Sequence, residues 1–458
     1  MPSSPDPFLP RDARFAAGEA LRAANPRERH ADLSLPAGRD PLAVLAEADR
    51  TRLPKLLPER YRRMSASPFA FFRGAAAVMA ADLAPSPRAG VAVQACGDCH
   101  IGNFGVARSP EGSLVFDIND FDETLPGIDI TVDLKRLCSS LALAVFESPD
   151  GSDHEAREAA RGAAHAYRKR MRELAAMSPL EVWGLRTDID DLVSHIDDPE
   201  ARRTVDGFIG KAGGEEPRNY QKLDAAANAD RPPSHWRIAD KPPAIFHLPA
   251  GAEGRDTLRA EAVFAGYMDS LPPERRALVA RYGLADVVFK VVGVGSVGTF
   301  CALGLFTTPD GDPLFLQIKE AGASCLAGLT DGDPRAGHGG ERVVEGQRLM
   351  QSASETFLGW TTEPATGRQF YVRHLKNKRL GEIAPLVQGH ALEAYGRLCG
   401  ATLARAHARS GDAATMAGYM GDCDTFDHAL AEFALRYAAL TRRDHAALLA
   451  RPAPAQPA

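Results

Sequence analysis

Two short stretches of this chain carry side chains suited to chemistry on phosphate. Residues 97–103 read GDCHIGN, and residues 116–122 read FDINDFD. An Asp, an Asn five residues later and a second Asp beyond a hairpin can orient a hydroxyl and hold magnesium on a nucleotide. We therefore predict a phosphotransferase in which Asp98 is the base or orienting group, and Asn103 and Asp120 bind magnesium.

A glycine-rich segment later in the chain offers a loop for the nucleotide phosphates. Residues 293–298 read GVGSVG and connect stretches that favour strands, at 287–294 and 299–306. A strand rather than a helix follows the glycines, which argues against a dinucleotide fingerprint and leaves a kinase-type loop or a plain hairpin. A third predicted strand, at 314–319, ends in a lysine that can contact the phosphates of ATP. The predicted nucleotide-binding residues are Gly293, Gly295, Ser296, Gly298 and Lys319.

Lys319 needs an anionic partner, because a lone ammonium is costly to bury in an apolar strand. Glu345, on a helix predicted at 341–352, is the predicted partner and completes the catalytic set with Asp98 and Lys319. Glu341, one turn earlier, is the alternative. An exposed amphipathic helix would carry the same glutamates without either role.

Further charged residues surround these motifs. Asp117, Asp122 and Glu123 lie close to Asp120 in sequence, and they could form a cation site without any kinase, or simply an acidic turn. Asp133 opens a predicted helix, where we expect a structural role in capping that helix or bracing the catalytic loop. Arg73 follows an aromatic run and could bind a phosphate, although an arginine that snorkels from an apolar helix is the more ordinary reading.

Composition sets the broad class of protein. The chain has 458 residues, a net charge of -6, 45% hydrophobic residues and 25% charged residues. These values are typical of a globular protein of two or three domains, or of one bilobal unit. The charge gives no global reason to bind nucleic acid, and we expect the basic cluster at 60–63 to be a solvated helix face. The N-terminus lacks a secretory signal and no run approaches a membrane span, so we expect a cytoplasmic protein without a membrane partner.

Two of the cysteines form a pattern that could be mistaken for a haem or metal site. The chain has seven, irregularly spaced, which favours reduced buried thiols over a disulfide framework. Residues 96–100 match the C-x-x-C-H pattern of haem attachment, and the C-x-x-C could bind zinc. Zinc would need more ligands, and no second Cys/His pair lies at finger spacing. We expect Cys96 and Cys99 to be packing residues that flank Asp98.

Hydrophobic periodicity and turn residues divide the chain into segments. Predicted helices lie at 134–146, 154–177, 258–282, 392–409 and 426–449, and further strands at 91–95, 113–118, 357–361 and 369–375. A polar loop or insertion is expected at 213–241. The predicted organisation is an irregular arm (1–40), a helical lobe with the catalytic and metal loop (41–285), a β-rich nucleotide-binding lobe (286–378), helices that complete the large lobe (379–450) and a tail (451–458).

The catalytic motifs carry a family resemblance. Asp98-x-His100-x-x-Asn103, followed by residues 119–122 (NDFD), resembles the G-D-x-H-x-x-N and I-D-F/W-[DE] motifs of aminoglycoside and choline phosphotransferases, members of the protein-kinase-like superfamily. Residues 67–74, 97–105, 116–127 and 370–375 also resemble the bacterial domain-of-unknown-function family 2252 over most of the chain. That family brings no established reaction. The resemblance to kinases implies an α+β, bilobal protein-kinase-like fold, with a small antiparallel β-rich lobe and a large, mainly helical lobe.

The order of the motifs departs from that superfamily. There the glycine loop, lysine and helix glutamate precede the catalytic Asp, whereas here they follow it. We therefore predict a circularly permuted fold, in which the helix at 392–409 takes the place of the helix that leads into the catalytic loop. The permutation predicts that Lys319 and Asp120 face one cleft.

Three other functions remain open from the sequence. An enzyme on the same fold could transfer AMP instead of the γ-phosphoryl group, and a catalytically silent regulator could bind nucleotide without turnover. A metal-dependent hydrolase could use Asp98, His100, Asp117 and Asp120, but it has no use for the glycine loop and Lys319. For the phosphotransferase, the acceptor is an unidentified molecule that bears a hydroxyl group.

Overall fold

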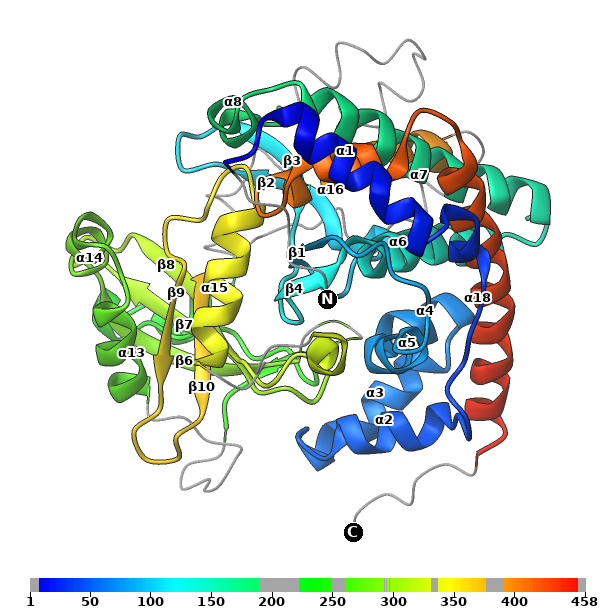
Figure 1. The fold of residues 1–458 in the computed structure, drawn as a ribbon. Helices are drawn as coiled ribbons and strands as arrows, with labels where there is room; N and C mark the ends of the chain where they lie inside the picture. Colours follow the sequence, from blue (N-terminus) through cyan, green and yellow to red (C-terminus); the bar gives the residue numbers. More distant parts are fainter. Residues whose placement is uncertain are drawn as a thin grey trace.

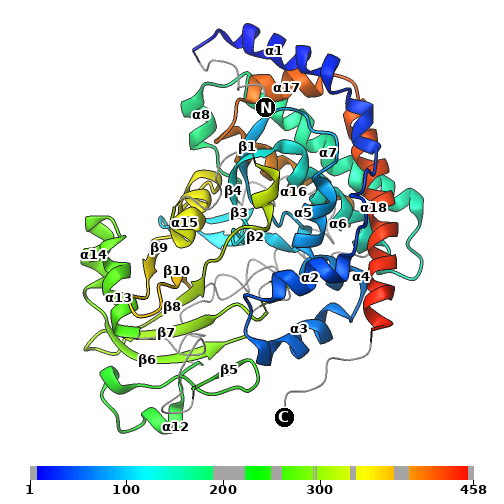
Figure 2. The same ribbon diagram turned by 60° about the horizontal axis from the view of Figure 1, so that its bottom comes forward.

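A computed structural model describes residues 8–188, 222–248, 260–291, 293, 295, 297–330, 337–375 and 391–451. Over these residues the protein is α+β, with many helices and small antiparallel sheets. The predicted α+β class is therefore confirmed. Figures 1 and 2 show a body of helices beside a region that contains the largest sheet.

The body of helices draws on both ends of the chain. Its N-terminal members are α1 (Arg11–Ala24), α2 (Pro41–Asp49), α3 (Leu57–Met64), α4 (Pro68–Gly74), α5 (Ala76–Leu83), α6 (Ile130–Val145), α7 (Asp153–Ala175) and α8 (Pro179–Gly184). Its C-terminal members are α16 (Ala391–Ala408), α17 (Ala413–Met420) and α18 (Thr425–Leu449). Because α7 packs against α16, α17 and α18, segments far apart in sequence form one unit.

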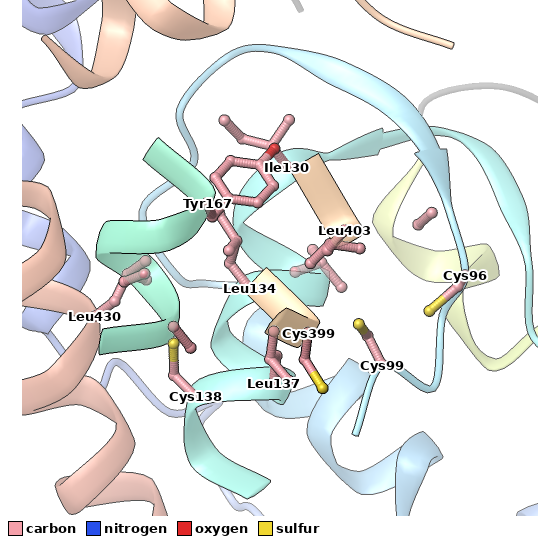
Figure 3. Close-up of a cluster of buried hydrophobic side chains, with 14 of the residues drawn as sticks. Cys96, Cys99, Ile130, Leu134, Leu137, Cys138, Tyr167, Cys399, Leu403 and Leu430 are labelled. Carbon is pink, nitrogen blue, oxygen red and sulfur yellow. The ribbon is translucent and has the colours of Figure 1, made fainter. Parts of the chain in front are cut away.

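The core of this body lies directly behind the predicted catalytic loop. Figure 3 shows Leu134 of α6, Tyr167 of α7, Leu403 of α16 and Leu430 of α18 gathered in one buried cluster, with Cys99 of the loop at its edge. Burying an aliphatic or aromatic side chain of this size contributes about 1.5–3 kcal/mol. The loop is therefore anchored to this buried cluster through Cys99.

The largest sheet has six antiparallel strands in the order β5-β6-β7-β8-β10-β9. These are β5 (Ile245–Phe246), β6 (Gly283–Lys290), β7 (Cys301–Thr307), β8 (Pro313–Glu320), β9 (Gly359–Thr362) and β10 (Gln369–His374). Lys319 lies on the central strand β8, opposite Cys301 on one side and Tyr371 on the other. Helix α13 (Ala260–Asp269) packs on β9, and α15 (Gly339–Met350) packs on β9 and β10.

Two small strand pairs position the predicted catalytic motifs. Strand β1 (Ala92–Ala95) pairs with β4 (Leu125–Asp129), and β2 (Phe104–Arg108) pairs with β3 (Leu114–Ile118). Because β2 and β3 are antiparallel with Phe104 opposite Ile118, the loop before β2 and the loop after β3 meet at one end of the hairpin. The N–H of Asn119 donates to the carbonyl of Asn103 at 2.7 Å and ties the two loops together.

Most of the predicted strands are present. Those predicted at 287–294, 299–306 and 314–319 correspond to β6, β7 and β8, and those at 91–95 and 113–118 correspond to β1 and β3. Strands β2 and β4 were not predicted. Strand β4 contains Pro126 and Gly127, residue types that disfavour strand interiors, and its pairing with β1 compensates for this.

The prediction of an irregular arm at 1–40 was wrong for much of this segment, because α1 occupies Arg11–Ala24. Helix α1 lies so close to α17 that a Cβ atom on Gly18 would come within 2.0 Å of the carbonyl oxygen of Thr415. An ion pair between Arg14 and Asp412 joins the same two segments. Contacts with the far end of the chain stabilise α1, and the local sequence pattern alone did not reveal it.

The helix predicted at 258–282 is also corrected. It divides into α13 and α14 (Pro273–Val279) at Pro272, because a proline disfavours helical continuation through the preceding residue. Val263 and Tyr267 pack into the core of the six-stranded sheet, so α13 belongs with the β-rich region rather than with the helical lobe. Of the predicted loop at 213–241, residues 213–221 lie outside the described residues, and 222–241 include α12 (Ala225–Asn228). Residues 376–390 and 452–458, at the start of the predicted C-terminal helical segment and in the tail, lie outside them too.

Candidate active site

Asp133 holds the predicted catalytic loop from below. Its buried carboxylate, in the first turn of α6, accepts hydrogen bonds from the N–H of Cys96 at 2.7 Å and of Gly97 at 3.0 Å. Gly97 turns the chain with φ 88°, and a Cβ atom there would lie 2.4 Å from the carbonyl oxygen of Glu123, so the turn requires glycine. The structural role expected of Asp133 is confirmed.

Asp98, the next residue, pairs with Arg136 of α6. The Arg136 Nη2 atom lies 2.5 Å from Asp98 Oδ1, and the Arg136 Nη2 group also donates to the carbonyl of Phe72 at 3.0 Å. Burial raises the pKa of Asp98 to about 6, against the charge of Arg136, which lowers it, and with help from the charge of Asp120. A carboxylate with a pKa near neutrality can accept a proton from a hydroxyl group. Arg136 was not among the predicted site residues.

Asn103 is locked in one orientation by the loop itself. Its Nδ2 group donates to the backbone carbonyl of Asp98 at 2.6 Å, which leaves the amide oxygen for another ligand. The link between Asn119 and Asn103 places Asp120 beside this amide. The predicted magnesium ligands, Asn103 and Asp120, are thus both attached to one hairpin end and line the same cavity.

Lys319 reaches the same place from the six-stranded sheet. Its Nζ atom lies 2.5 Å from Asp122 Oδ2 and 3.9 Å from Asp120 Oδ1, and Tyr371 donates to Asp122 Oδ1 at 2.5 Å. The lysine is 1% exposed, and burial alone would lower its pKa. The charges of Asp120 and Asp122 outweigh burial and raise the pKa of Lys319, so the ammonium stays charged.

The predicted partnership of Lys319 with Glu345 is not present. Asp120 and Asp122 pair with the lysine, while Glu345 is exposed on the outer side of α15. The helix turns Arg342 toward the acidic loop instead, where its guanidinium donates to the carbonyls of Asp122 and Gly322 at 2.9 and 3.0 Å. The residue of α15 that contacts the site is therefore Arg342, and not the predicted Glu345.

The glycine-rich loop between β6 and β7 lies above Asp98. A Cβ atom on Gly295 would lie 3.6 Å from Asp98 Oδ2, and Gly298 adopts φ 92°. Gly293 and Gly295 line the cavity. Ser296, the other residue predicted in this loop, lies outside the described residues.

One cavity of about 740 Å³ collects these groups. Its walls include Asp98, Asn103 and Asp120 on the side of the hairpin, the glycine loop above them, and helices α2 to α5 opposite. Lys319 is not itself a lining residue and contacts the cavity through Asp120 and Asp122, which are. The predicted site residues other than Glu345, Gly298 and Ser296 are therefore in the cavity wall or directly behind it.

The N-terminal arginines were misjudged from the sequence. Arg60 was expected on a solvated helix face, yet it is 1% exposed, whereas Arg62 in the same cluster has a side chain that is 71% exposed. Arg52, Arg60 and Arg73 all line the cavity. The cluster at 60–63 is amphipathic, and the sequence offered no signal as to which of its arginines faces inward.

The C-x-x-C motif has one more potential ligand than the sequence indicated. Cys96, Cys99 and Asp133 each place one ligand atom within 4.8 Å of the others, and Figure 3 shows the two sulfur atoms on the same side of the loop. Both oxygens of Asp133 already accept backbone hydrogen bonds, and a structural zinc site uses four ligands. The contacts in the described part of the chain fit packing thiols beside a loop-bracing carboxylate.

Asp117, which the hydrolase alternative would need, instead pairs with residues outside the cavity. Its side chain is 2% exposed and pairs with Arg405 of α16 at 2.5 Å. Ser352 donates to it through both its N–H and its hydroxyl, each at 2.7 Å. Asp117 therefore joins the hairpin to the helical body and does not line the cavity.

Comparison with protein families places the chain. A family model described as "Uncharacterized protein conserved in bacteria (DUF2252)" matches residues 52–451. The protein belongs to this family, which confirms the family resemblance seen in its motifs. Comparison with curated proteins and with solved structures produced no match. None of the described helices combines the length and apolar character needed to cross a bilayer.

Proposed function

We propose that this protein is an ATP- and Mg-dependent phosphotransferase that acts on a hydroxyl group of a small molecule or protein. The observation that carries the proposal is the meeting of Lys319 with Asp120 and Asp122, the latter 197 residues away in sequence, at the cavity lined by Asp98 and Asn103. Kinase-like enzymes gather a strand lysine, a metal-binding Asp and Asn, and a catalytic Asp in one cleft between two lobes.

The order of elements supports a circularly permuted version of that fold. Strand β6, the glycine loop, β7, the lysine strand β8 and helix α15 follow one another as they do in a kinase nucleotide lobe. Helix α16 lies beside β1 and β3, and Tyr395 on it donates to the carbonyl of Ile101 in the catalytic loop at 2.9 Å. This placement suits a helix that would lead into the catalytic loop if the two chain ends were joined elsewhere.

The donor set fits magnesium. Asn103 presents an amide oxygen, Asp120 presents a carboxylate, and these hard oxygen ligands are the ones that Mg²⁺ prefers. When bound, the ion would neutralise charge on the nucleotide phosphates. Asp120 and Asp122 keep Lys319 charged directly behind the cavity wall, where its positive charge would favour binding of the phosphates.

In this mechanism Asp98 orients the acceptor hydroxyl and takes its proton as the phosphoryl group is transferred. Arg136 holds the Oδ1 atom of Asp98, so the Oδ2 atom is presented to the cavity. The glycine loop covers the same region from above and excludes water. The position of the Asp98 carboxylate is thus fixed by its ion pair with Arg136 of the helical body.

One observation favours a second candidate on the same nucleotide site. Active kinases need the strand lysine to pair with a helix glutamate, and here Asp122, in the loop after β3, pairs with the lysine. A nucleotide-binding regulator without turnover, or an enzyme that transfers AMP, is consistent with that arrangement. ATP labelled at the α- or γ-phosphate separates the three: γ-label on the acceptor supports phosphoryl transfer, α-label supports AMP transfer, and binding without label transfer supports the regulator.

Calorimetric titration of Mg-ATP into the wild-type protein and Lys319→Ala tests the nucleotide site. We expect binding in the wild type that is weakened at least tenfold by the substitution, because a charge-assisted contact contributes about 1.5–3 kcal/mol. Glu345→Gln is the matched control and should bind as the wild type, since Glu345 is exposed. No binding by folded wild-type protein, with folding verified by thermal unfolding, would overturn the proposal.

A further inference from the structure

Helix α3 and the chain that precedes it hold the glycine-rich loop by hydrogen bonds. The Arg52 Nη1 group donates to the carbonyl of Val297 at 2.6 Å, the N–H of Leu53 donates to the carbonyl of Gly298 at 2.8 Å, and the Arg60 Nη1 group donates to the carbonyl of Gly295 at 3.2 Å. Gly298 has no room for a side chain at this contact, because a Cβ atom would lie 2.9 Å from Arg52 Cβ. The N-terminal segment is therefore part of the cavity on the side opposite Lys319.

Two of the three residues that bind the glycine-rich loop are positively charged, although neutral donors could hold the loop equally well. Arg52 and Arg60 share one carboxylate, Asp49, whose Oδ1 atom lies 3.3 Å from Arg52 Nε and 3.0 Å from Arg60 Nε. The backbone N–H of Leu53 shows that a neutral donor can hold the same loop. Burial and the neighbouring charge of Arg60, only partly offset by Asp49, Glu123 and Asp122, lower the pKa of Arg52 to about 10, and burial lowers that of Arg60. A buried cation of this kind is stabilised by an anion that enters beside it.

At Lys319, by contrast, carboxylates outnumber the cation. The lysine is one cation between two carboxylates, Asp120 and Asp122, so it has little positive charge to spare. The Arg52 Nε atom is buried and, among the described residues, donates no hydrogen bond, although its side chain lines the cavity and is 15% exposed. The arginines among the cavity-lining residues, Arg52, Arg60 and Arg73, all belong to the N-terminal wall, whereas Asp98, Asp120, Asp122 and Glu123 also line the cavity.

The position of this wall connects it to the proposed reaction centre. Arg60 binds the carbonyl of Gly295, and the Cα–Cβ direction of the same glycine leads to within 3.6 Å of Asp98 Oδ2. Arg60 is held there by Asp49 and by the carbonyl of Gly74, which its Nη2 group reaches at 2.7 Å. An anionic group under the glycine loop and next to Asp98 would lie close to both guanidinium groups.

We infer that Arg52 and Arg60 form a second anion site in the cavity, which binds the polyphosphate end of the nucleotide from the side opposite Lys319. The inference rests on the proposed function for the identity of its ligand. It assigns the N-terminal segment a direct part in nucleotide binding and explains why two cations, rather than neutral donors, meet the glycine loop. Arginine suits this role because its planar fork of N–H groups matches phosphate oxygens.

Arg52 is the residue to change. Arg60 donates hydrogen bonds to Asp49 and to the carbonyls of Gly74 and Gly295 from a buried position, and its loss endangers the fold of α3 itself. Arg52→Gln removes the charge, and Arg52→Lys keeps the charge but not the guanidinium contact with the loop. Arg62→Gln is the matched control, because Arg62 belongs to the same basic segment, pairs with Glu59 and has a side chain that is 71% exposed.

Isothermal titration with sodium tripolyphosphate, without magnesium or nucleotide, measures this site alone. We expect wild-type binding that weakens as salt is raised, a loss of at least about tenfold in Arg52→Gln, a smaller loss in Arg52→Lys, which keeps the charge but not the planar fork, and near wild-type affinity in Arg62→Gln. Absence of wild-type binding, or an unchanged affinity in Arg52→Gln, would overturn the inference. Equal losses in Arg52→Lys and Arg52→Gln would also overturn it, because they would show that Arg52 acts only by holding the loop.

The Mg-ATP titration of Lys319→Ala separates this inference from the proposed function. Tripolyphosphate binding that depends on Arg52, in a protein that binds no Mg-ATP, would sink the phosphotransferase and leave an anion site. Mg-ATP binding that depends on Lys319, with Arg52→Gln unaffected toward both ligands, would keep the phosphotransferase and reject the second site.

Discussion

Asp98 and Asp117 lie in neighbouring parts of the same structure, and an arginine of the helical body holds each of them at the same distance. Arg136 Nη2 is 2.5 Å from Asp98 Oδ1, and Arg405 Nη2 is 2.5 Å from Asp117 Oδ1. Their surroundings differ. The side chain of Asp98 is 18% exposed and lines the cavity, whereas that of Asp117 is 2% exposed.

The donors around the two carboxylates differ as well. Asp117 accepts from Arg405, from the N–H of Ile118 and from both donors of Ser352, so both of its oxygens are used. His100 Nε2 lies 3.7 Å from Asp98 Oδ2, which is too far for a hydrogen bond. The same kind of ion pair therefore joins two parts of the fold where both carboxylate oxygens have donors, and leaves a candidate reactive group where one oxygen faces a cavity.

The largest expected effect is on turnover. Asp98→Asn keeps the size of the side chain and an oxygen for Arg136 but removes the base, so we expect Mg-ATP turnover to fall by roughly 10²–10⁴-fold. Asp117→Asn, measured on the fraction that remains folded, should stay within about threefold of the wild type, because Asp117 does not line the cavity. Release of labelled phosphate checks both variants. Similar losses in the two would remove the distinction between them.

The loss of stability should be larger in Asp117→Asn than in Asp98→Asn, the reverse of the order expected for turnover. Asp117→Asn leaves the guanidinium of Arg405 buried without a charged partner, which costs about 3–5 kcal/mol in comparable buried pairs. Asp98→Asn should cost less than half of that, because water in the cavity can solvate the exposed side of Asp98 and Arg136 retains the carbonyl of Phe72. Urea unfolding of the two variants measures the difference, and a smaller loss for Asp117→Asn than for Asp98→Asn contradicts it.

The pH dependence of turnover tests Asp98 specifically. Burial raises its pKa to about 6, so the base is ionised above that pH and becomes protonated as the pH falls through it. We expect kcat/KM to be level above pH 7 and to drop about tenfold per unit below pH 6, since this parameter reports ionisations of the free enzyme. The Asp117→Asn protein should keep this acid limb, and the residual turnover of Asp98→Asn should lack it. A wild-type limb near pH 4 would show that the carboxylate is as well solvated as an ordinary aspartate.

The surroundings of Asp98 could be predicted from the sequence, and those of Asp117 could not. Asp98 and Asn103 belong to one loop, so their spacing alone brings them together, and Asp120 follows because β2 and β3 form a hairpin. The meeting of Lys319 with Asp120 needed more than local spacing. It was predicted from the permuted order of family motifs, which supplies information about distant contacts.

The arginines escaped prediction because their roles depend on partners far away in the sequence. Arg136, Arg405 and Arg60 each lie on a helix that also carries other charged residues, and only packing decides which of these are buried. Glu345 was predicted because it lies on the helix that follows Lys319, yet the loop between β3 and β4 brings Asp122 to the lysine instead. Ser352, one of the donors to Asp117, lies just beyond the end of α15, where no motif marks it.

Ser352 provides the smallest and most discriminating test. Ser352→Ala deletes one donor to Asp117 Oδ2 and leaves the N–H of the same residue and the guanidinium of Arg405 in place. A hydrogen bond to a charged group contributes about 1.5–3 kcal/mol, and the remaining donors should hold the loss near the lower figure, measured by urea unfolding. Turnover should not change, because Asp117 joins the hairpin to α16 rather than to the cavity. A fall in turnover without a loss of stability would place Asp117 in the catalytic set and erase its contrast with Asp98.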